Sequence, residues 1–456
     1  MTALSCDSPV QVFERFTDTH AMGEVWRKQL PSLLGKPFEF TACNVQYARC
    51  RTYLNPDSWH KSFLCVCYEF DVTRERGTSH KPMTYGRAYL HGRSRDEFAV
   101  LAPADGAHLV PELDMIVWNF PDDPHLPQLH ELLDVTRVTP YFPYPNVPFA
   151  ADAIIDINVE VVRYRPEQRC ILRYDVAYGP NRDHCVLYAK VFADDNGERV
   201  FTRIQHCHDA ASALGVRIAR PLGYSAAVRT VWQEELIGTS LTAALDAGNY
   251  EAPMTAIGHC LARLHAADLP MQKTVTRDER LADVRKKSNK LAQMLPALAV
   301  DLNTIIARAQ SELAMLPPAQ KAVIHGDVHF GQFLITPDGA LALFDFDEWS
   351  SGDPAQDLAD LIVDPYVSQF ARDKTETSRI LSSRVARALL ASYRSHAAWA
   401  VSDASIAWQA RVQLINKAYR AAIQQEPRWR EKVPALVALA SRGVDLGANL
   451  EREMTQ

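Results

Sequence analysis

The sequence has no long apolar segment. None of its runs approaches the roughly 18 uninterrupted apolar residues that a membrane-spanning helix needs, although 47% of the 456 residues are apolar. The opening stretch, MTALSCDSPVQVFERF, lacks a basic end followed by an apolar core, so we expect no secretory signal. The nine cysteines are odd in number, scattered and without a C-x-x-C pair. We therefore expect reduced thiols and a cytoplasmic protein.

The sequence also lacks an excess of positive charge. Its 49 Lys and Arg residues against 55 Asp and Glu residues give a net charge of −6. A dedicated nucleic-acid binder would carry a basic stripe, so we expect neither a nucleic-acid nor a membrane partner. The charge is uneven, however. Residues 372–432 contain twelve basic and five acidic residues, a net charge of +7, and the rest of the chain sums to −13.

Composition divides the chain into regions. Residues 1–139 combine one helix near residues 10–30 with strand-like runs, which predicts an N-terminal α+β accessory domain. The stretch TPYFPYPNVP, residues 139–148, has four prolines in ten residues, which predicts a stiff linker at residues 140–149. Residues 150–237 alternate apolar runs with turn residues and predict an antiparallel sheet with one helix inserted. Residues 238–456 show mainly the 3.6-residue period of helices.

The first and second sheet regions resemble each other. Residues 44–89 read NVQYARCR, LCVCYEFDV and MTYGRAY in order, and residues 158–192 read NVEVVRYR, CILRYDV and VLYAKVF. Alternating strands also resemble one another by chance, so both interpretations stay open. If the repeat is real, residues 43–92 form a small antiparallel sheet with Arg87 at the position of Lys190. That sheet is then a lid or scaffold without a nucleotide of its own.

Polar side chains gather in the segment VIHGDVHFGQFLITPDGALALFDFDEWSSGDPAQDLADL, residues 323–361. A strand, a Pro-Asp-Gly turn and a returning strand predict a hairpin. Asp327 follows the strand before it, Gln332 comes five residues later, and Asp345 ends the returning strand. Phosphoryl transfer needs such a set, because one carboxylate accepts the proton of the attacking hydroxyl while oxygen ligands bind Mg²⁺ at the nucleotide phosphates.

The pattern H-G-D-x-H-x-G-Q, followed by D-F-D-E-x-x-x-G-D-P-x-x-D-L-A, resembles the aminoglycoside phosphotransferase and choline kinase family. The resemblance implies an α+β, protein-kinase-like fold with a small antiparallel β lobe and a larger helical lobe, here with the additional N-terminal domain. It implies that Asp327 is the catalytic base, that His325 shapes the catalytic loop, and that Gln332 and Asp345 bind Mg²⁺. The usual residue at Gln332 is Asn, but Gln also occurs in maltokinase-like sugar kinases of the family.

The resemblance extends to the sheet of residues 150–237. It implies that Lys190 in LYAKVF binds the α- and β-phosphates of ATP or GTP. It also implies that the hinge strand TVWQEELIG contacts the adenine near Glu234, Glu235 and Leu236. The segment RYRPEQRCILRY stands where protein kinases carry a glycine-rich loop, yet it contains no glycine. The phosphates are then expected to meet backbone amides or arginine side chains, of which we select Arg165.

Several of these side chains have alternative interpretations. His325, Asp327 and His329 alternate, so on a strand they could share one face and bind zinc. Asp353 precedes a proline and is expected to cap the next helix. Asp357 and Asp360 form either a solvated helix face or, for Asp357, a link to the catalytic loop.

These observations predict a nucleotide- and Mg²⁺-dependent phosphotransferase with the alcohol group of a small molecule as acceptor. Because the region expected to line the acceptor has a net charge of +7, a sugar or another polyol is favoured over a polycationic aminoglycoside antibiotic. A third possibility is a pseudokinase, a nucleotide-binding regulatory module, which the glycine-free loop and Gln332 favour.

Overall fold

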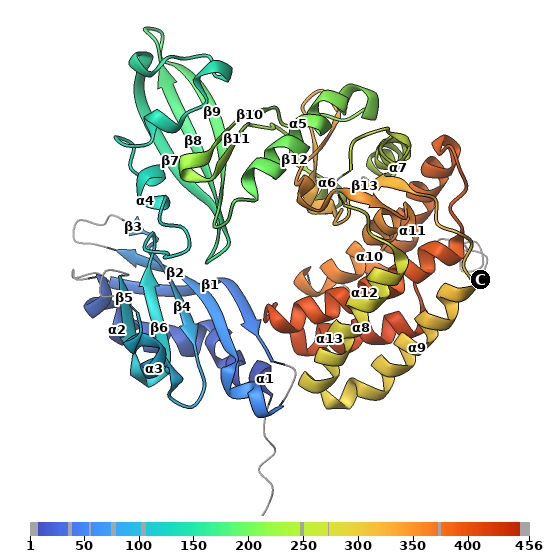
Figure 1. Cartoon of the computed structure of the whole chain (residues 1–456), viewed down its shortest axis with the longest axis horizontal. Helices are drawn as coiled ribbons and strands as arrows, with labels where there is room; N and C mark the ends of the chain where they lie inside the picture. The colour runs from blue at the N-terminus through green and yellow to red at the C-terminus, as the bar shows by residue number, and fades with distance from the viewer. Residues whose placement is uncertain are drawn as a thin grey trace, which may run out of the picture. The chain divides into compact units, whose positions relative to one another are not determined.

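The computed structural model describes residues 8–34, 39–53, 56–73, 79–101, 106–246, 250–271, 273–372 and 375–446 (Figure 1). Its contacts divide the chain into two compact units. The first comprises Met1–Phe201, Leu222–Glu234 and Ile423–Glu426, and the second comprises Thr202–Pro221, Glu235–Ala422 and Pro427–Gln456. Antiparallel sheets and many helices make the chain an α+β protein, as predicted.

The first unit contains most of the strands. Its helices are α1 (Pro9–Phe13), α2 (Thr19–Leu34), α3 (Arg93–Ala99) and α4 (Leu129–Leu133), and α5 (Gly197–Leu214) starts in it. Its strands are β1 (Glu39–Arg51), β2 (Phe63–Thr73), β3 (Ser79–His80), β4 (Met83–Ala88), β5 (Ala107–Val110), β6 (Met115–Asn119), β7 (Ile154–Arg165), β8 (Arg169–Tyr178), β9 (Asp183–Phe192), β10 (Pro221–Ser225) and β11 (Thr230–Glu234).

The second unit is mainly helical. Its helices are α6 (Leu241–Asp246), α7 (Glu251–Ala266), α8 (Arg277–Met294), α9 (Ala299–Met315), α10 (Ala355–Arg372), α11 (Thr375–His396), α12 (Asp403–Ile423) and α13 (Trp429–Arg442). Its short strands are β12 (Thr239–Ser240), β13 (Ala322–Ile324), β14 (Phe333–Ile335), β15 (Leu341–Leu343) and β16 (Ser350–Gly352). Within the described ranges, no helix is both long and apolar enough to cross a membrane.

The two sheets of the first unit have the same topology. The first sheet has the strand order β1-β2-β4-β6-β5, with the short strand β3 paired to β2 outside this path, and the second sheet has the order β7-β8-β9-β11-β10. In each, a helix follows the third of these strands along the chain, and the last two strands are joined by a single 3₁₀ turn that ends in a left-handed residue, Asp114 (φ 49°) or Arg229 (φ 46°). The strand order expected for residues 43–92 is thus confirmed in the described residues.

The register of the two sheets also agrees with the predicted repeat. Cys65 pairs with Arg49 on one side and with Arg87 on the other. Ile171 pairs with Arg163 on one side and Lys190 on the other. Arg87 therefore occupies in the first sheet the position that Lys190 occupies in the second.

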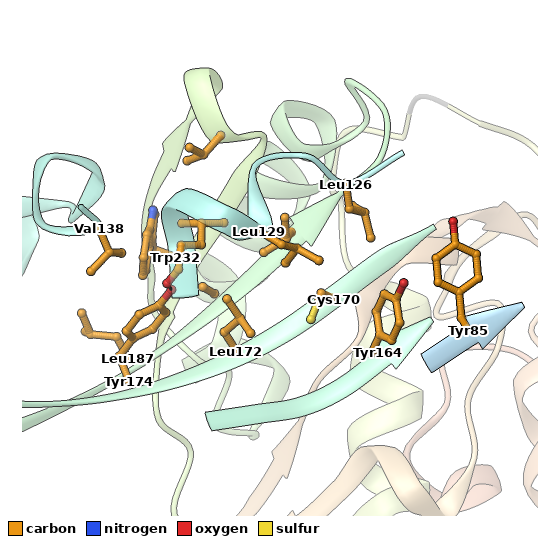
Figure 2. Close-up of a cluster of buried hydrophobic side chains, with 14 of the residues drawn as sticks. Tyr85, Leu126, Leu129, Val138, Tyr164, Cys170, Leu172, Tyr174, Leu187 and Trp232 are labelled. Atoms are coloured by element: carbon orange, nitrogen blue, oxygen red, sulfur yellow. Dashed lines mark hydrogen bonds between the residues drawn. The ribbon is translucent and has the colours of Figure 1, made fainter. Parts of the chain in front are cut away.

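One hydrophobic core is shared by both sheets (Figure 2). Tyr85 of β4 lies edge-on to Tyr164 of β7, with ring centroids 6.3 Å apart. On β8, Cys170, Leu172 and Tyr174 alternate with more exposed residues and point into this core, as the period of a strand requires. The opposite face of the second sheet is therefore the one that carries Lys190.

The proline-rich segment is part of that core. Phe142 and Phe149 are 4% and 6% exposed, and the ring of Phe142 lies 5.7 Å from Tyr174 and 5.3 Å from Trp232. Residues 140–149, which we expected to be a stiff linker, are thus packed inside the first unit. The reason is that aromatic residues alternate with the prolines and bury more apolar surface than an exposed linker can.

The helix expected near residues 10–30 is divided into α1 and α2 by a 3₁₀ turn at Glu14–Thr17. The side chain of Asp18 accepts hydrogen bonds from the backbone N–H groups of His20 and Ala21, both at 3.0 Å. An aspartate in this position starts a new helix, and the apolar period alone did not reveal it.

Candidate active site

The loop that carries Asp327 begins directly after β13. This strand is buried and pairs with β16, so its end is fixed in position. The chain then turns at Gly326, which has a φ of +86° and whose missing Cβ would lie 2.5 Å from the carbonyl oxygen of Glu348. Only glycine satisfies both conditions, and the turn therefore directs Asp327 away from the strand.

Asp357 holds this loop in place from helix α10. Its side chain is completely buried and accepts hydrogen bonds from the N–H groups of His325 at 2.7 Å and Gly326 at 3.0 Å. It also accepts one from Nε2 of His265 at 3.2 Å. Burial opposes ionisation of Asp357, but the hydrogen bond and charge of His265 outweigh it and lower the pKa of the carboxyl. The link between Asp357 and the loop is thus confirmed, and the solvated helix face is wrong, since Asp360 is buried too.

Helix α10 binds the loop at two further points. Asp364, two turns beyond Asp357, accepts a hydrogen bond from the N–H of Phe330 at 3.0 Å. Gln356 donates a hydrogen bond from Nε2 to the carbonyl of Gly326 at 2.9 Å. Residues seven apart lie on one face of a helix, so one rigid element fixes both ends of the loop around Asp327.

Asp353 caps the start of α10, as predicted. Its Oδ1 accepts the N–H of Ala355 at 3.0 Å, and its Oδ2 forms an ion pair with Nε of Arg277 at 2.6 Å. The cap therefore joins α10 to helix α8 as well.

His325 lies between the loop and the segment after β15. It is completely buried, its Nε2 lies 3.3 Å from the carbonyl oxygen of Phe344, and its ring centroid lies 5.2 Å from that of Phe346. These contacts join the loop to the segment that contains Asp345, which agrees with the predicted role of shaping the loop.

Gln332 and Asp345 lie at the end of the β14–β15 hairpin. Phe333 pairs with Leu343, and the N–H of Phe344 donates to the carbonyl of Gln332 at 3.2 Å. The side-chain Oε1 of Gln332 accepts the N–H of His329 at 3.0 Å. A carbonyl oxygen has a second lone pair, so this donor set of one amide and one carboxylate oxygen fits Mg²⁺.

The zinc alternative has less support. His329 uses Nδ1 to accept the N–H of Gly331 at 3.1 Å, and burial lowers the pKa of His329. In the ranges that the structure describes, no three His, Cys, Asp or Glu side chains form a group suited to a metal ion.

Asp327 is accessible, with 44% of its side chain exposed, and a cation lies beside it. Nζ of Lys417, on helix α12, is 4.0 Å from Oδ1 of Asp327, and the lysine side chain is only 10% exposed. Lys417 also acts electrostatically on His329 and on Asp360, whose pKa burial raises well above its usual value. Sequence reasoning did not select Lys417, because nothing local distinguishes it from other helix lysines.

The residues predicted to bind the nucleotide lie on the second sheet. Lys190 is 9% exposed, with Nζ 5.7 Å from the centroid of the Phe192 ring. Arg165 pairs with Arg169, which pairs with Phe192. In the same way, Arg163 pairs with Ile171, which pairs with Lys190. Because alternate residues share a face, the arginines lie on the face of Lys190, opposite the core. The predicted hinge leaves β11 at Glu234, and the segment through Glu235 and Leu236 to β12 has no regular structure.

Known proteins resemble parts of this chain. The model of the "phosphotransferase enzyme family" matches residues 190–401, just under half of the chain. This region therefore resembles that family. The match starts at Lys190 and includes the loop of Asp327 and the hairpin of Asp345, so the resemblance to the family is confirmed. An uncharacterized protein of Deinococcus radiodurans is 33% identical over 116 residues, which are 24% of this chain and 34% of that protein.

Solved structures of kinases are also similar to this chain. A choline/ethanolamine kinase family protein from Mesorhizobium loti is 16% identical, with a TM-score of 0.42 and coverage of 65% of this chain and 90% of that one. A choline kinase from Streptococcus pneumoniae is 14% identical, with a TM-score of 0.43 and coverage of 63% and 94%. An aminoglycoside phosphotransferase from Streptomyces rimosus is 17% identical, with a TM-score of 0.37 and coverage of 54% and 89%.

Proposed function

We propose that this phosphotransferase moves the γ-phosphate of ATP or GTP to a hydroxyl group of a neutral or anionic small molecule, a sugar or another polyol. The observation that carries the proposal is the loop of Asp327, which α10 fixes through Asp357 and Asp364 while the carboxylate itself stays accessible. A base that must meet a substrate hydroxyl needs both properties.

Asp327 accepts the proton of the attacking hydroxyl in this proposal. Because phosphoryl transfer requires little covalent chemistry from the protein, positioning and electrostatic stabilisation supply most of the rate enhancement. The fixed loop supplies the positioning. Lys417, 4.0 Å from Asp327, supplies a positive charge beside the base that orients its carboxylate.

Gln332 and Asp345 would hold Mg²⁺ when it is bound with the nucleotide, and the ion would neutralise charge on the phosphates. Lys190 and Arg165 supply cations for phosphate oxygens from the second sheet, a chemistry for which Arg and Lys are suited. These assignments rest on the donor types and on the register of the strands described above.

The charges beside Asp327 support this acceptor class. Lys417 and Arg420 lie one helical turn apart on α12 and both act electrostatically on His329 in the loop. An ammonium group bound next to each of them would be repelled by an energy on the order of a kcal/mol per close pair. Neutral hydroxyls and anionic groups meet no such repulsion, which favours a polyol over a polycation.

A coupled assay of ADP or GDP release tests this proposal. Sugars, polyols, amino alcohols and aminoglycosides are offered in turn, with wild type and Asp327→Asn compared for each. We expect release with a sugar or polyol that needs Asp327. Release at micromolar aminoglycoside with no response to any sugar or polyol would show that the acceptor class is wrong.

A pseudokinase remains the second candidate, because Oε1 of Gln332 already accepts a backbone hydrogen bond and the turn before Arg169 has no glycine. Nucleotide binding without turnover for every acceptor class, in wild type and in Asp327→Asn alike, would favour it.

A further inference from the structure

In the first sheet, two cationic side chains occupy the cross-strand positions that correspond to Arg163 and Lys190 in the second sheet. Arg49 and Arg87 flank Cys65 as Arg163 and Lys190 flank Ile171. In the second sheet these positions lie on the face that we assign to the nucleotide phosphates. The corresponding face of the first sheet is covered instead, since Tyr85 stacks on Trp118 at 4.9 Å and meets Tyr164.

The turn between β7 and β8 covers the cations of the first sheet. Nε of Arg87 forms an ion pair with Oε1 of Glu167 at 2.5 Å, with both side chains largely buried. Nη1 of Arg49 donates to Oε1 of Gln168 at 3.3 Å, and Nε2 of Gln168 donates to the hydroxyl of Tyr47 at 2.6 Å. The carboxylate of Glu167 thus lies on Arg87 where, in the second sheet, a phosphate oxygen is expected on Lys190.

The turn itself has an unfavourable backbone. The N–H of Gln168 donates to the carbonyl of Arg165 at 3.1 Å, Pro166 is the second residue, and Glu167 has a φ of 63°. This is the pattern of a type II turn, in which glycine is preferred at the position of Glu167. A strained residue persists only where its surroundings determine it.

Buried groups of the first unit determine the turn. Oδ2 of Asp123 accepts the N–H of Glu167 and the hydroxyl of Tyr164, both at 2.8 Å, and the Asp123 side chain is completely buried. The turn is therefore fixed on its backbone by Asp123 and on its side chain by Arg87. By the family resemblance, this turn lies in the segment where protein kinases carry a glycine-rich loop.

We propose that residues 39–119 are a second small lobe that has lost nucleotide binding. Its Arg87 acts as a positioning residue that holds the β7–β8 turn for the nucleotide expected on the second sheet. This inference rests on the proposed function, because it needs a nucleotide at the second sheet. The first sheet then holds in place, through Arg87, a turn that has no glycines.

The test is the affinity of the full chain for a fluorescent ATP analogue with Mg²⁺. Arg87→Met and Glu167→Gln should each weaken it by roughly 5- to 30-fold, a usual range for coupling between sites, and the double variant no further, because both remove one interaction. Arg87→Lys should restore part of the affinity. The matched control is Lys81→Met, which removes a cation that pairs with Glu69 at 3.5 Å and Asp71 at 3.6 Å on the same sheet, and it should bind like wild type.

Two further measurements distinguish the positioning role of Arg87 from a merely structural role. Glu167→Gly relieves the strained backbone while losing the ion pair, so it should lower the melting temperature less than Glu167→Gln does and still weaken nucleotide binding as much. The KM for the acceptor should stay unchanged in all variants, whereas the KM for the nucleotide should rise.

The outcomes distinguish the two proposals. If wild type binds no nucleotide, the proposed function is wrong and this inference with it. If wild type binds nucleotide and Arg87→Met binds it within twofold, only the positioning role is wrong. A nucleotide bound to the first sheet would also contradict the inference.

Discussion

Replacing Asp357 by Asn is expected to destabilise the second unit and to stop turnover. The carboxylate accepts three hydrogen bonds, two at Oδ2 and one at Oδ1. An asparagine has one carbonyl oxygen, so in its better orientation it keeps the bonds from His325 and His265 but turns its NH₂ group toward the N–H of Gly326. One charge-assisted bond is lost, at about 1.5–3 kcal/mol, and the other two lose about half of their strength. We expect a total cost of about 3–5 kcal/mol, the range for breaking a buried ionic contact.

Urea unfolding at pH 7 measures this cost, and steady-state kinetics at a temperature where the variant is folded measures the effect on catalysis. We expect kcat to fall about 100-fold, as for an ångström-scale displacement of a catalytic group. Asp364→Asn is the matched control, because Asp364 accepts one N–H and the asparagine carbonyl can keep that bond. A loss of stability below 1 kcal/mol for Asp357→Asn, or equal losses for the two variants, would refute the reasoning.

Three other outcomes are expected. Asp327→Asn should abolish turnover while nucleotide affinity stays within a few-fold, because the base acts on the acceptor. Asp345→Asn should instead lose the Mg²⁺-dependent part of nucleotide binding. Near-normal turnover of Asp327→Asn would show that its assigned role is wrong. Lys417→Met should lower kcat/KM about tenfold or more without changing the KM for the nucleotide, and Arg308→Met, which removes a cation paired with Glu312, is its control. The pKa of Asp357 is lowered in the folded protein, so its ionised form stabilises the fold above its usual pKa of about 3.9. That contribution is lost as the pH falls below about 4. As the pH falls from about 6 to about 3, the urea midpoint should therefore decline less steeply in Asp357→Asn than in wild type.

The loop chemistry could be predicted because it is local. Asp327, Gln332 and Asp345 lie within 19 consecutive residues, and the Pro-Asp-Gly turn determines which strands form the hairpin. The alternation of the strands likewise predicted the antiparallel sheet of residues 150–237, and the repeated strand order of residues 43–92 was one of two interpretations that it left open. In these cases the period of the sequence is itself the structural constraint.

The partners of these residues could not be predicted, because they come from distant elements. His265 and Asp357 are 92 residues apart, and Arg87 and Glu167 are 80 apart. A helical or strand period indicates which face is apolar, but it does not indicate which other element covers that face. The apolar residues around Asp357 and Asp360 on α10 were a visible signal that these two acids are buried, which the solvated-face interpretation missed.

The sequence by itself therefore determined the resemblance of the central region to a family and the residue types of the site. Only the tertiary structure decided that the proline-rich segment belongs to a core, that Lys417 lies beside Asp327, and that the first sheet fixes the turn of the second. The physical reason is that local geometry follows from backbone periods and turn residues. Burial, ion pairs and hydrogen bonds between distant segments depend instead on how completed elements pack.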